Sequence, residues 1–319
     1  MNRVLFHLLV CGLLISHRTH AFENVPNAPF AQFANVPDPG QLTVRFLYEQ
    51  SEAYNIWAYN PAGQKEMSSV KWWSGGEQYG IDVLQGWVTL QYGITEKWAA
   101  DLSVGYASSS WRYFSNYGPP GGVEATTGIM DVGFGVRYQI WKEGEDENAK
   151  WKPTLTFRAG AVMPGTFDQY FPYAPGTRSA AVEPELLARK HFGWPGLGAY
   201  FDGLYRWNMT SGNGQYIVCV GFFQEIKGWE LDVGYRHLGT VHGDNVVFDP
   251  TTYYVTYPRA VRENLDSIQA GFSYTTSKKK WTWGFLTQYN LDGNNSQQQF
   301  WLGGYLEIPF QIVKPKEGR

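Results

Sequence analysis

The chain of 319 residues carries 29 acidic and 26 basic residues, so its formal net charge is −3. This mildly acidic balance, without a basic cluster, excludes a nucleic-acid-binding surface of the usual electrostatic kind. Aromatic residues make up 17% of the chain, and there are 36 glycines. Such a composition favours a β-rich protein over a helical one.

Residues 1–21 have the pattern of a secretory signal peptide. Arg3 precedes an apolar run that ends at Ile15, and Thr19 and Ala21 supply small residues before a cut. We predict export and cleavage after Ala21, with a short buried helix as the alternative. The mature chain then keeps only Cys219, which excludes an intramolecular disulfide bond. No later segment has the roughly eighteen consecutive apolar residues of a transmembrane helix.

The stretch 93–106, GITEKWAADLSVGY, sets the interpretation of the chain. After a polar turn, Trp98, Leu102 and Tyr106 fall on one face of an extended segment, and Asp101 and Ser103 fall on the other. A period of two indicates a strand with two different faces. Strands that cross a bilayer in a β-barrel have this pattern, with apolar residues toward lipid, aromatic residues at each interface and polar residues toward the lumen.

The alternating pattern recurs along the chain. The expected strands are 41–51, 80–92, 98–106, 127–141, 152–163, 180–190, 197–207, 215–223, 229–237, 263–274, 281–289 and 300–310. Most have the nine to eleven residues, approximately, of a tilted membrane crossing. The connections alternate between long and short, as in outer-membrane barrels that keep their short turns in the periplasm.

These observations predict an all-β fold, a transmembrane antiparallel β-barrel over residues 41–310, with about twelve strands and both termini periplasmic. Residues 311–319 form a C-terminal tail. The long connections 52–79 and 238–262 have room for a further hairpin. Residues 22–40 contain four prolines and no periodicity. We expect an extended N-terminal segment there, either a plain linker or a segment tucked into the mouth of the barrel.

Charged residues recur on the predicted inward faces. An Arg that faced lipid near the midplane would destabilise the barrel by roughly 2–4 kcal/mol, so this placement supports the assignment of the two faces. The inward bases are all arginines, whose planar donors suit pairing with carboxylates on neighbouring strands. The lumen-lining candidates are Arg45, Asp101, Asp131, Arg137, Arg158, Asp202, Arg206, Asp232 and Arg236. Further inward charges are Glu49, Glu183, Glu185, Arg189, Glu230 and Glu307. Together they form either a sieving lattice in a polar conduit or a structural network that fills a narrow barrel.

The predicted external loops are rich in aromatic residues. These side chains suit the membrane interface, and they also suit the capture of small apolar or aromatic ligands. The candidates are Trp72, Trp73, Trp111, Tyr113, Tyr170, Phe171, Tyr253 and Tyr254. Charges at 143–147 and 278–280 fall in short turns, and we interpret them as solvated turn charges.

The histidines do not favour a lipid-hydrolysing barrel enzyme. Such an enzyme places a His and a Ser two residues apart on one strand face, and no Ser follows His191, His237 or His242 at that spacing. His237 and His242 share a loop with Asp244 and Asp249, but the spacing matches no defined metal site. No catalytic group, cofactor or metal is therefore predicted.

Three short motifs resemble one bacterial outer-membrane family. GITEKW at 93–98 with DLSVGY at 101–106, GIMDVGFGVRY at 128–138, and the strand 155–165 are similar, in this order, to the family described as "MetA-pathway of phenol degradation" or transporter-like. The resemblance runs from about residue 41 to 310. It implies a barrel that passes hydrophobic or aromatic compounds, and it implies no particular catalytic or ligand residue.

One feature departs from the usual pattern of such barrels. Their last strand often ends on an aromatic residue that the assembly machinery reads, and Phe310 fits this role. Here, however, nine further residues, 311–319, follow it. The assembly signal would therefore be internal, or the last strand would lie elsewhere.

The sequence thus predicts an outer-membrane channel or transporter-like barrel for small solutes, hydrophobic or aromatic ones included, that acts by passive diffusion. The expected partners are outer-membrane lipids, the outer-membrane assembly machinery and a small-molecule solute, with no nucleic acid. One alternative is a structural or adhesive barrel with a filled lumen whose loops bind a partner. Another is an outer-membrane enzyme of unknown type.

Overall fold

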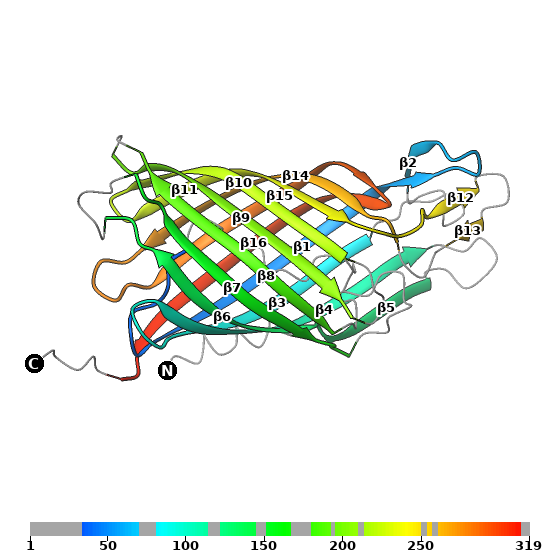
Figure 1. Cartoon of the computed structure of the whole chain (residues 1–319). Helices are drawn as coiled ribbons and strands as arrows, with labels where there is room; N and C mark the ends of the chain where they lie inside the picture. Colours follow the sequence, from blue (N-terminus) through cyan, green and yellow to red (C-terminus); the bar gives the residue numbers. More distant parts are fainter. Residues whose placement is uncertain are drawn as a thin grey trace, which may run out of the picture.

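The computed structural model describes residues 34–69, 81–113, 122–144, 151–166, 180–192, 195–209, 214–249, 254–256 and 261–313. Their strands form one sheet that closes into a barrel (Figure 1). Within these ranges no helix is long and apolar enough to span a membrane. The predicted signal peptide and the first part of the predicted N-terminal segment lie outside the described residues.

The barrel wall is built from strands that follow one another in sequence around the circumference. They are β1 (Gln41–Tyr59), β3 (Ile81–Gly93), β4 (Trp98–Tyr113), β6 (Val132–Trp141), β7 (Thr154–Met163), β8 (Ala181–His191), β9 (Leu197–Asn208), β10 (Gly214–Ile226), β11 (Trp229–Thr240), β14 (Asn264–Thr275), β15 (Thr282–Asn294) and β16 (Ser296–Gln311). All neighbouring pairs are antiparallel. The predicted all-β barrel of twelve antiparallel strands is therefore confirmed.

Closure of the barrel depends on β1. This strand pairs with β16 from Gln41↔Gln311 onward, and on its other edge it pairs with β3 from Leu42↔Tyr92 onward. The first and last strands of the sheet are thereby joined, and no edge of the wall is left open to a neighbour.

The strands alternate between a buried face and an exposed face, as the sequence pattern predicts. In β7, for example, Phe157 is 42% exposed while the next residue, Arg158, is 7% exposed. Exposed faces carry large apolar side chains along most of the wall, including Phe134, Val136 and Val220. The barrel is thus apolar outside and polar inside, which is the reverse of a water-soluble sandwich.

The two ends of the barrel differ. At one end β1 begins, β16 ends and the connections 94–97, 142–153, 192–196, 227–228 and 276–281 join the strands. We call this the turn end, and the opposite end the loop end. Short extra strands, β2 (Lys65–Ser69), β12 (Val247–Asp249) and β13 (Tyr254–Thr256), lie at the loop end (Figure 1). They occupy the two long connections in which the sequence left room for a hairpin.

The predicted strand 127–141 is not continuous. β5 (Gly122–Ile129) and β6 both pair with β4, but their registers differ by one residue, with Ile129↔Tyr106 on one side and Gly133↔Ser103 on the other. Met130 and Asp131 between them are both buried. Two successive inward residues with a one-residue register change are a β-bulge, which interrupts the alternation on which the prediction rested.

Two predicted connections are shorter than the sequence indicated. Residues 107–126 were expected to form a loop, but β4 continues to Tyr113 and β5 begins at Gly122. Residues 290–299 are also strand, apart from a tight turn at Asn295, whose φ is 55°. Both stretches are rich in Ser, Asn, Gln and Gly, so their sequences lack the regular alternation of apolar and polar residues on which the prediction rested.

Candidate functional site

The predicted lumen-lining residues lie on the inner side of the wall. Relative exposure is 8% or less for Arg45, Asp101, Asp131, Arg137, Arg158, Asp202, Arg206 and Arg236. Asp232 is half-buried. Their arrangement is not one ring. The structure brings some of them into a single network and leaves others apart.

The network, which we call the charged lattice, comprises Asp101, Arg137, Arg158, Glu183, Glu185 and Arg206. Its centre is Arg158, whose Nε donates to Asp101 Oδ1 at 2.6 Å and to Oδ2 at 3.0 Å. Its Nη1 lies 3.4 Å from both Glu183 Oε2 and Glu185 Oε2. The lattice therefore ties β4, β7 and β8 together with charge-assisted bonds that span several strands.

Strand register explains why these charges meet. Arg158 stands opposite Glu185 on β8 and opposite Arg137 on β6. Arg137 Nε also approaches Asp101, at 3.5 Å from Oδ1, so one carboxylate on β4 faces two neighbouring guanidinium groups. Without Asp101, the two arginines would repel each other in a setting that screens charge poorly.

A glycine lets Asp101 reach Arg158 across the intervening strand. Gly135 on β6 stands opposite Asp101. A Cβ placed there would lie 2.7 Å from Arg158 Nε and 2.8 Å from Asp101 Oδ2. The hydrogen atom of glycine leaves room for the pair to pass directly over the β6 backbone.

Another lattice contact spans a gap in the wall. β8 and β9 pair at Ala181 and Val182, and again from Glu185 onward, but not at Glu183 and Pro184. Proline has no N–H to donate to the ladder. Glu183 Oε1 accepts from Arg206 Nε at 2.5 Å across this gap. The ion pair therefore holds the seam where the backbone ladder is missing.

Another part of the inner wall has a different chemistry. An apolar cluster faces inward from β1, β3, β4, β15, β16 and the bulge after β5, and it comprises Leu47, Trp87, Ala107, Met130, Leu286 and Tyr305. Next to it, Gln269 Nε2 donates to Gln288 Oε1 at 2.9 Å, and Ser267 Oγ donates to Asn290 Oδ1 at 2.9 Å. This part of the inner wall thus combines apolar side chains and uncharged amides with charged side chains such as Arg45 and Glu49.

Arg45 and Asp131 have partners outside the charged lattice. Arg45 donates through Nε to Glu307 Oε2 at 2.9 Å, and its guanidinium lies 5.6 Å from the Tyr305 ring centre. Asp131 Oδ1 accepts from the backbone N–H of Gly165 at 2.9 Å, near the loop end. Asp131 therefore holds the chain that follows β7.

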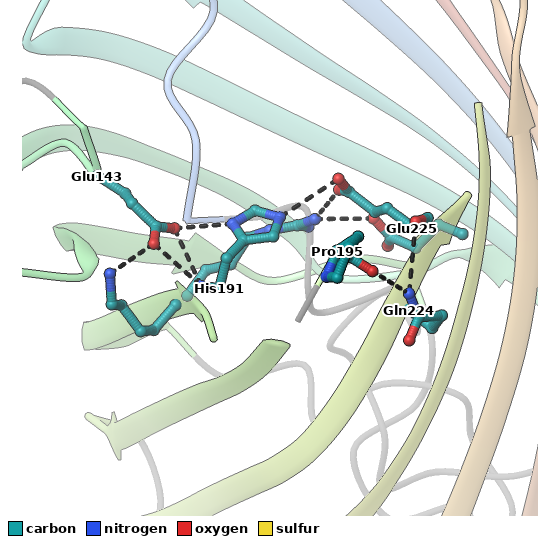
Figure 2. A network of polar contacts seen from close by, with 8 residues as sticks. Glu143, His191, Pro195, Gln224 and Glu225 are labelled. Atoms are coloured by element: carbon teal, nitrogen blue, oxygen red, sulfur yellow. Dashed lines mark hydrogen bonds and ion pairs between the residues drawn. The ribbon is translucent and has the colours of Figure 1, made fainter. Parts of the chain in front are cut away.

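A second polar network lies at the turn end (Figure 2). Its central residue is His191, at the end of β8, whose Nδ1 lies 2.8 Å from Glu143 Oε2 and whose Nε2 lies 3.3 Å from Glu225 Oε2. Lys190 Nζ donates to Glu143 Oε1 at 2.6 Å. Arg189 pairs with Glu225 and also with Glu230, at 3.0 Å. We call these six residues the mouth cluster.

The mouth cluster borders a cavity of about 630 Å³ at the turn end. Arg45, Arg189, His191, Glu225, Glu230 and Glu307 are among its lining residues. A cavity of this size is within the range of small-molecule sites. Its polar walls make it an opening for water or hydrophilic groups at this end of the barrel.

Glu143 corrects one interpretation of the sequence. The turn charges at 143–147 were expected to be solvated, but Glu143 binds Lys190 and His191, two strands away. Burial acts to raise the pKa of Glu143, yet the hydrogen bonds from Lys190 and His191 outweigh it and hold this pKa below its usual value. No local sequence signal connects residue 143 with residues 190 and 191, because the contact depends on the fold.

The predicted loop aromatics cannot be placed as a group. Trp72, Trp73, Tyr170, Phe171 and Tyr253 lie outside the described residues. Trp111 and Tyr113 belong to β4, and Tyr254 belongs to β13, so these three are strand residues and not loop residues.

The described part of the chain contains no group of three or more His, Cys, Asp or Glu side chains placed to hold a metal ion. His237, which the sequence put near Asp244 and Asp249, instead approaches Asp266, with Nδ1 2.6 Å from Oδ1. Its Nε2 lies 3.4 Å from the Tyr216 hydroxyl.

Comparison with known proteins gives the fold. No protein-family model matches the chain, and no curated protein matches it by sequence. The structure is similar to an outer membrane channel from Pseudomonas putida F1, with a TM-score of 0.63 and 14% identity over 90% of this chain and 100% of that chain. Identity at this level shows a shared fold alone.

Two further likenesses are weaker. The translocator domain of the autotransporter NalP from Neisseria meningitidis has a TM-score of 0.45 and 13% identity, over 88% of this chain and 91% of that one. The TodX monoaromatic hydrocarbon channel has a TM-score of 0.44 and 8% identity, over 92% and 94%. Neither supports an inference about this chain.

Gly135→Ala should destabilise the barrel by about 1–3 kcal/mol, because the added methyl group separates Arg158 from Asp101 and leaves buried charges poorly paired. Gly133→Ala on the same strand is the matched control, since a Cβ there meets nothing within 4 Å. Equilibrium unfolding of the refolded proteins in lipid vesicles measures both. Equal stability of the two variants would contradict this role for Gly135.

Glu143 should make a small pH-dependent contribution to stability. Its pKa is lowered in the folded state, so its contribution is present above the unfolded-state pKa and is lost as the pH falls through the folded-state pKa. Glu143→Gln should therefore lower the free energy of unfolding by less than about 1 kcal/mol at neutral pH, because Glu143 is partly exposed. In strong acid the substitution should leave the free energy of unfolding unchanged. Glu96→Gln, an exposed turn carboxylate, is the control. A difference that persists in strong acid would contradict the assignment.

Proposed function

We propose that this chain is a channel of the bacterial outer membrane through which small solutes diffuse passively. The observation that carries the proposal is a closed barrel whose outer face is apolar and whose inner face is charged, with a polar cavity at one end. A wall of this kind suits lipid on one side and water or solute on the other. The fold shared with the Pseudomonas putida channel supports the same function.

The outer aromatic residues support a membrane boundary at the turn end. Trp229 packs against Tyr274 with ring centres 4.8 Å apart and against Trp283 at 5.6 Å. On the far side of the barrel, Trp98 packs against Tyr138 at 4.7 Å. Aromatic side chains gather at such interfaces because their rings tolerate both lipid and headgroups.

We assign the turn end to the periplasm and both chain termini with it, since short turns face the periplasm in such barrels. This orientation rests on export by the predicted signal peptide with cleavage after Ala21. It also makes Phe310, in the last strand, the residue that the assembly machinery would read. In the structure β16 continues to Gln311, so this signal lies one residue inside the strand.

We further propose kinship with the transporter-like family linked to phenol degradation. The three motifs that carry the resemblance lie on the β3–β4 turn with β4, on the bulged pair β5 and β6, and on β7 with the two residues after it. The lumen offers both charged side chains and the apolar side chains of Trp87 and Tyr305, and this mixture supports solutes with an apolar or aromatic body and a polar group. The loop aromatics are proposed to collect such solutes.

A structural barrel with a filled lumen is the second candidate, and one observation favours it. Glu49, Arg236, Gln288 and Asn290 are each 1% exposed or less. Side chains this buried leave little space around them in the middle of the barrel. A barrel with a filled lumen would not conduct ions, whereas a channel would, so single-channel recording distinguishes the two.

The refolded mature protein should give steady single-channel openings in planar bilayers. Arg137→Gln should shift the ion preference toward cations, because it removes a positive charge from the lattice. Lys278→Gln, in the exposed β14–β15 turn, removes the same charge far from the lattice and should leave the reversal potential unchanged. Complete silence from a folded, heat-modifiable barrel would contradict the channel and favour the filled lumen.

Membrane embedding has its own test. Val220 lies at the centre of β10 and is 43% exposed, while Ile226 ends the strand and is 55% exposed. Val220→Arg should destabilise the protein by about 2–4 kcal/mol, and Ile226→Arg by about 1 kcal/mol or less. Unfolding in lipid vesicles gives both values. Equal values would indicate that this face does not cross a hydrocarbon layer.

A further inference from the structure

The segment before β1 enters the barrel. Ala34 is 1% exposed, and its carbonyl oxygen accepts hydrogen bonds from Thr156 Oγ1 at 2.6 Å and from Gln139 Nε2 at 3.3 Å. Both donors are buried, on the inward faces of β7 and β6 and close to their turn ends. The chain therefore crosses from β1 over β3 and β4 to reach the inner wall at β6 and β7.

The base of this segment is fixed at the rim. The N–H of Gly40 donates to the carbonyl oxygen of Gly93 at 2.8 Å, and the N–H of Ile312 donates to the carbonyl oxygen of Gly40 at 2.9 Å. A Cβ on Gly93 would collide with the carbonyl oxygens of Pro37 and Asp38. Because Gly93 has no side chain, the backbone of residues 37 and 38 can pass close to the end of β3.

The segment is held inside the barrel without becoming part of the wall. Pro37 and Pro39 cannot donate to a β-ladder, so the stretch NVPDPG does not add a strand to β3. Within the described residues, its contact with β6 and β7 consists of the two side-chain hydrogen bonds to Ala34. A contact made through side chains, outside the β-ladder, can break without opening the wall.

This segment forms one side of the turn-end cavity. Asn35, Val36, Pro37 and Asp38 line the cavity together with Arg189, His191 and Glu225 of the mouth cluster. Figure 2 shows His191 between Glu143 and Glu225 in this cluster. The open space at this end is therefore what remains between the segment and the cluster.

We propose that residues 34–40 form a plug that docks on Gln139 and Thr156 and restricts passage through the turn end. This inference rests on the proposed channel function. Docked, the plug confines solutes to the cavity beside the mouth cluster. Released from β6 and β7, it opens the part of the mouth that it crosses.

Thr156→Val tests the docking contact on the full mature chain, because it removes the hydroxyl and keeps the side-chain shape. Losing one hydrogen bond of roughly 1 kcal/mol changes the docked-to-released ratio about fivefold. Single-channel records should therefore show about fivefold more time in a larger-conductance state. Thr89→Val is the matched control, since Thr89 Oγ1 contacts Ser103 Oγ on β3 and β4, away from the plug.

A disulfide bond tests the same contact in the opposite direction. In a Cys219→Ala background, Ala34→Cys combined with Gln139→Cys should join the plug to β6 on oxidation. Oxidised channels should lose the larger-conductance state, and reduction should restore it. Each single cysteine variant should show no response to the redox change.

The outcomes separate this inference from the channel function. Conducting channels that are unchanged by Thr156→Val and by formation of the crosslink would overturn the plug and leave the channel intact. Silence of every variant, with a folded barrel on a heat-modifiability gel, would overturn both. A crosslink that fails to form in a conducting barrel would show that Ala34 does not dock on β6, and it would also overturn the plug.

Discussion

The double pairing of β1, with β3 on one edge and β16 on the other, is the interaction on which the rest of the structure depends. It satisfies the backbone of what would otherwise be two open edges, as a spanning sheet in lipid requires. Once the sheet is closed, the period of two along each strand separates the side chains into an outer and an inner population. Phe157 and Arg158 show the result within two consecutive residues.

Closure brings the inward side chains close together, and most of the charged ones form ion pairs. The inward arginines and carboxylates are largely buried, so each needs a partner within reach. Arg158 satisfies this need with carboxylates from β4 and β8, and Gly135 removes the obstacle between Arg158 and Asp101. The Glu183–Arg206 pair then spans the seam that Pro184 leaves in the wall. Charge pairing thus stabilises the wall and at the same time gives the lumen its polarity.

Much of this arrangement could be predicted from sequence, because lipid imposes a local rule. The faces of β4, β7 and β11 follow directly from alternation, and so does the inward position of Arg137 or Arg206. Features that depend on contacts between distant strands could not be predicted. The bulge at Met130 and Asp131 breaks the local period, and beyond Tyr289 the strand β15 has only Leu291 as a large apolar outward residue. Glu143 meets His191 only after two strands have been placed side by side.

The N-terminal segment shows how local chemistry and global closure combine. Its prolines exclude it from the sheet, and its connection to β1 keeps it at the rim, so the inner wall is the surface within reach. Backbone carbonyls there need donors, and Thr156 and Gln139 supply them for Ala34. The barrel middle is crowded by long side chains, whereas the turn end keeps a cavity that residues 35–38 line on one side. If this segment acts as the proposed plug, the narrow part of a path through this end is set by the segment and not by the closed wall.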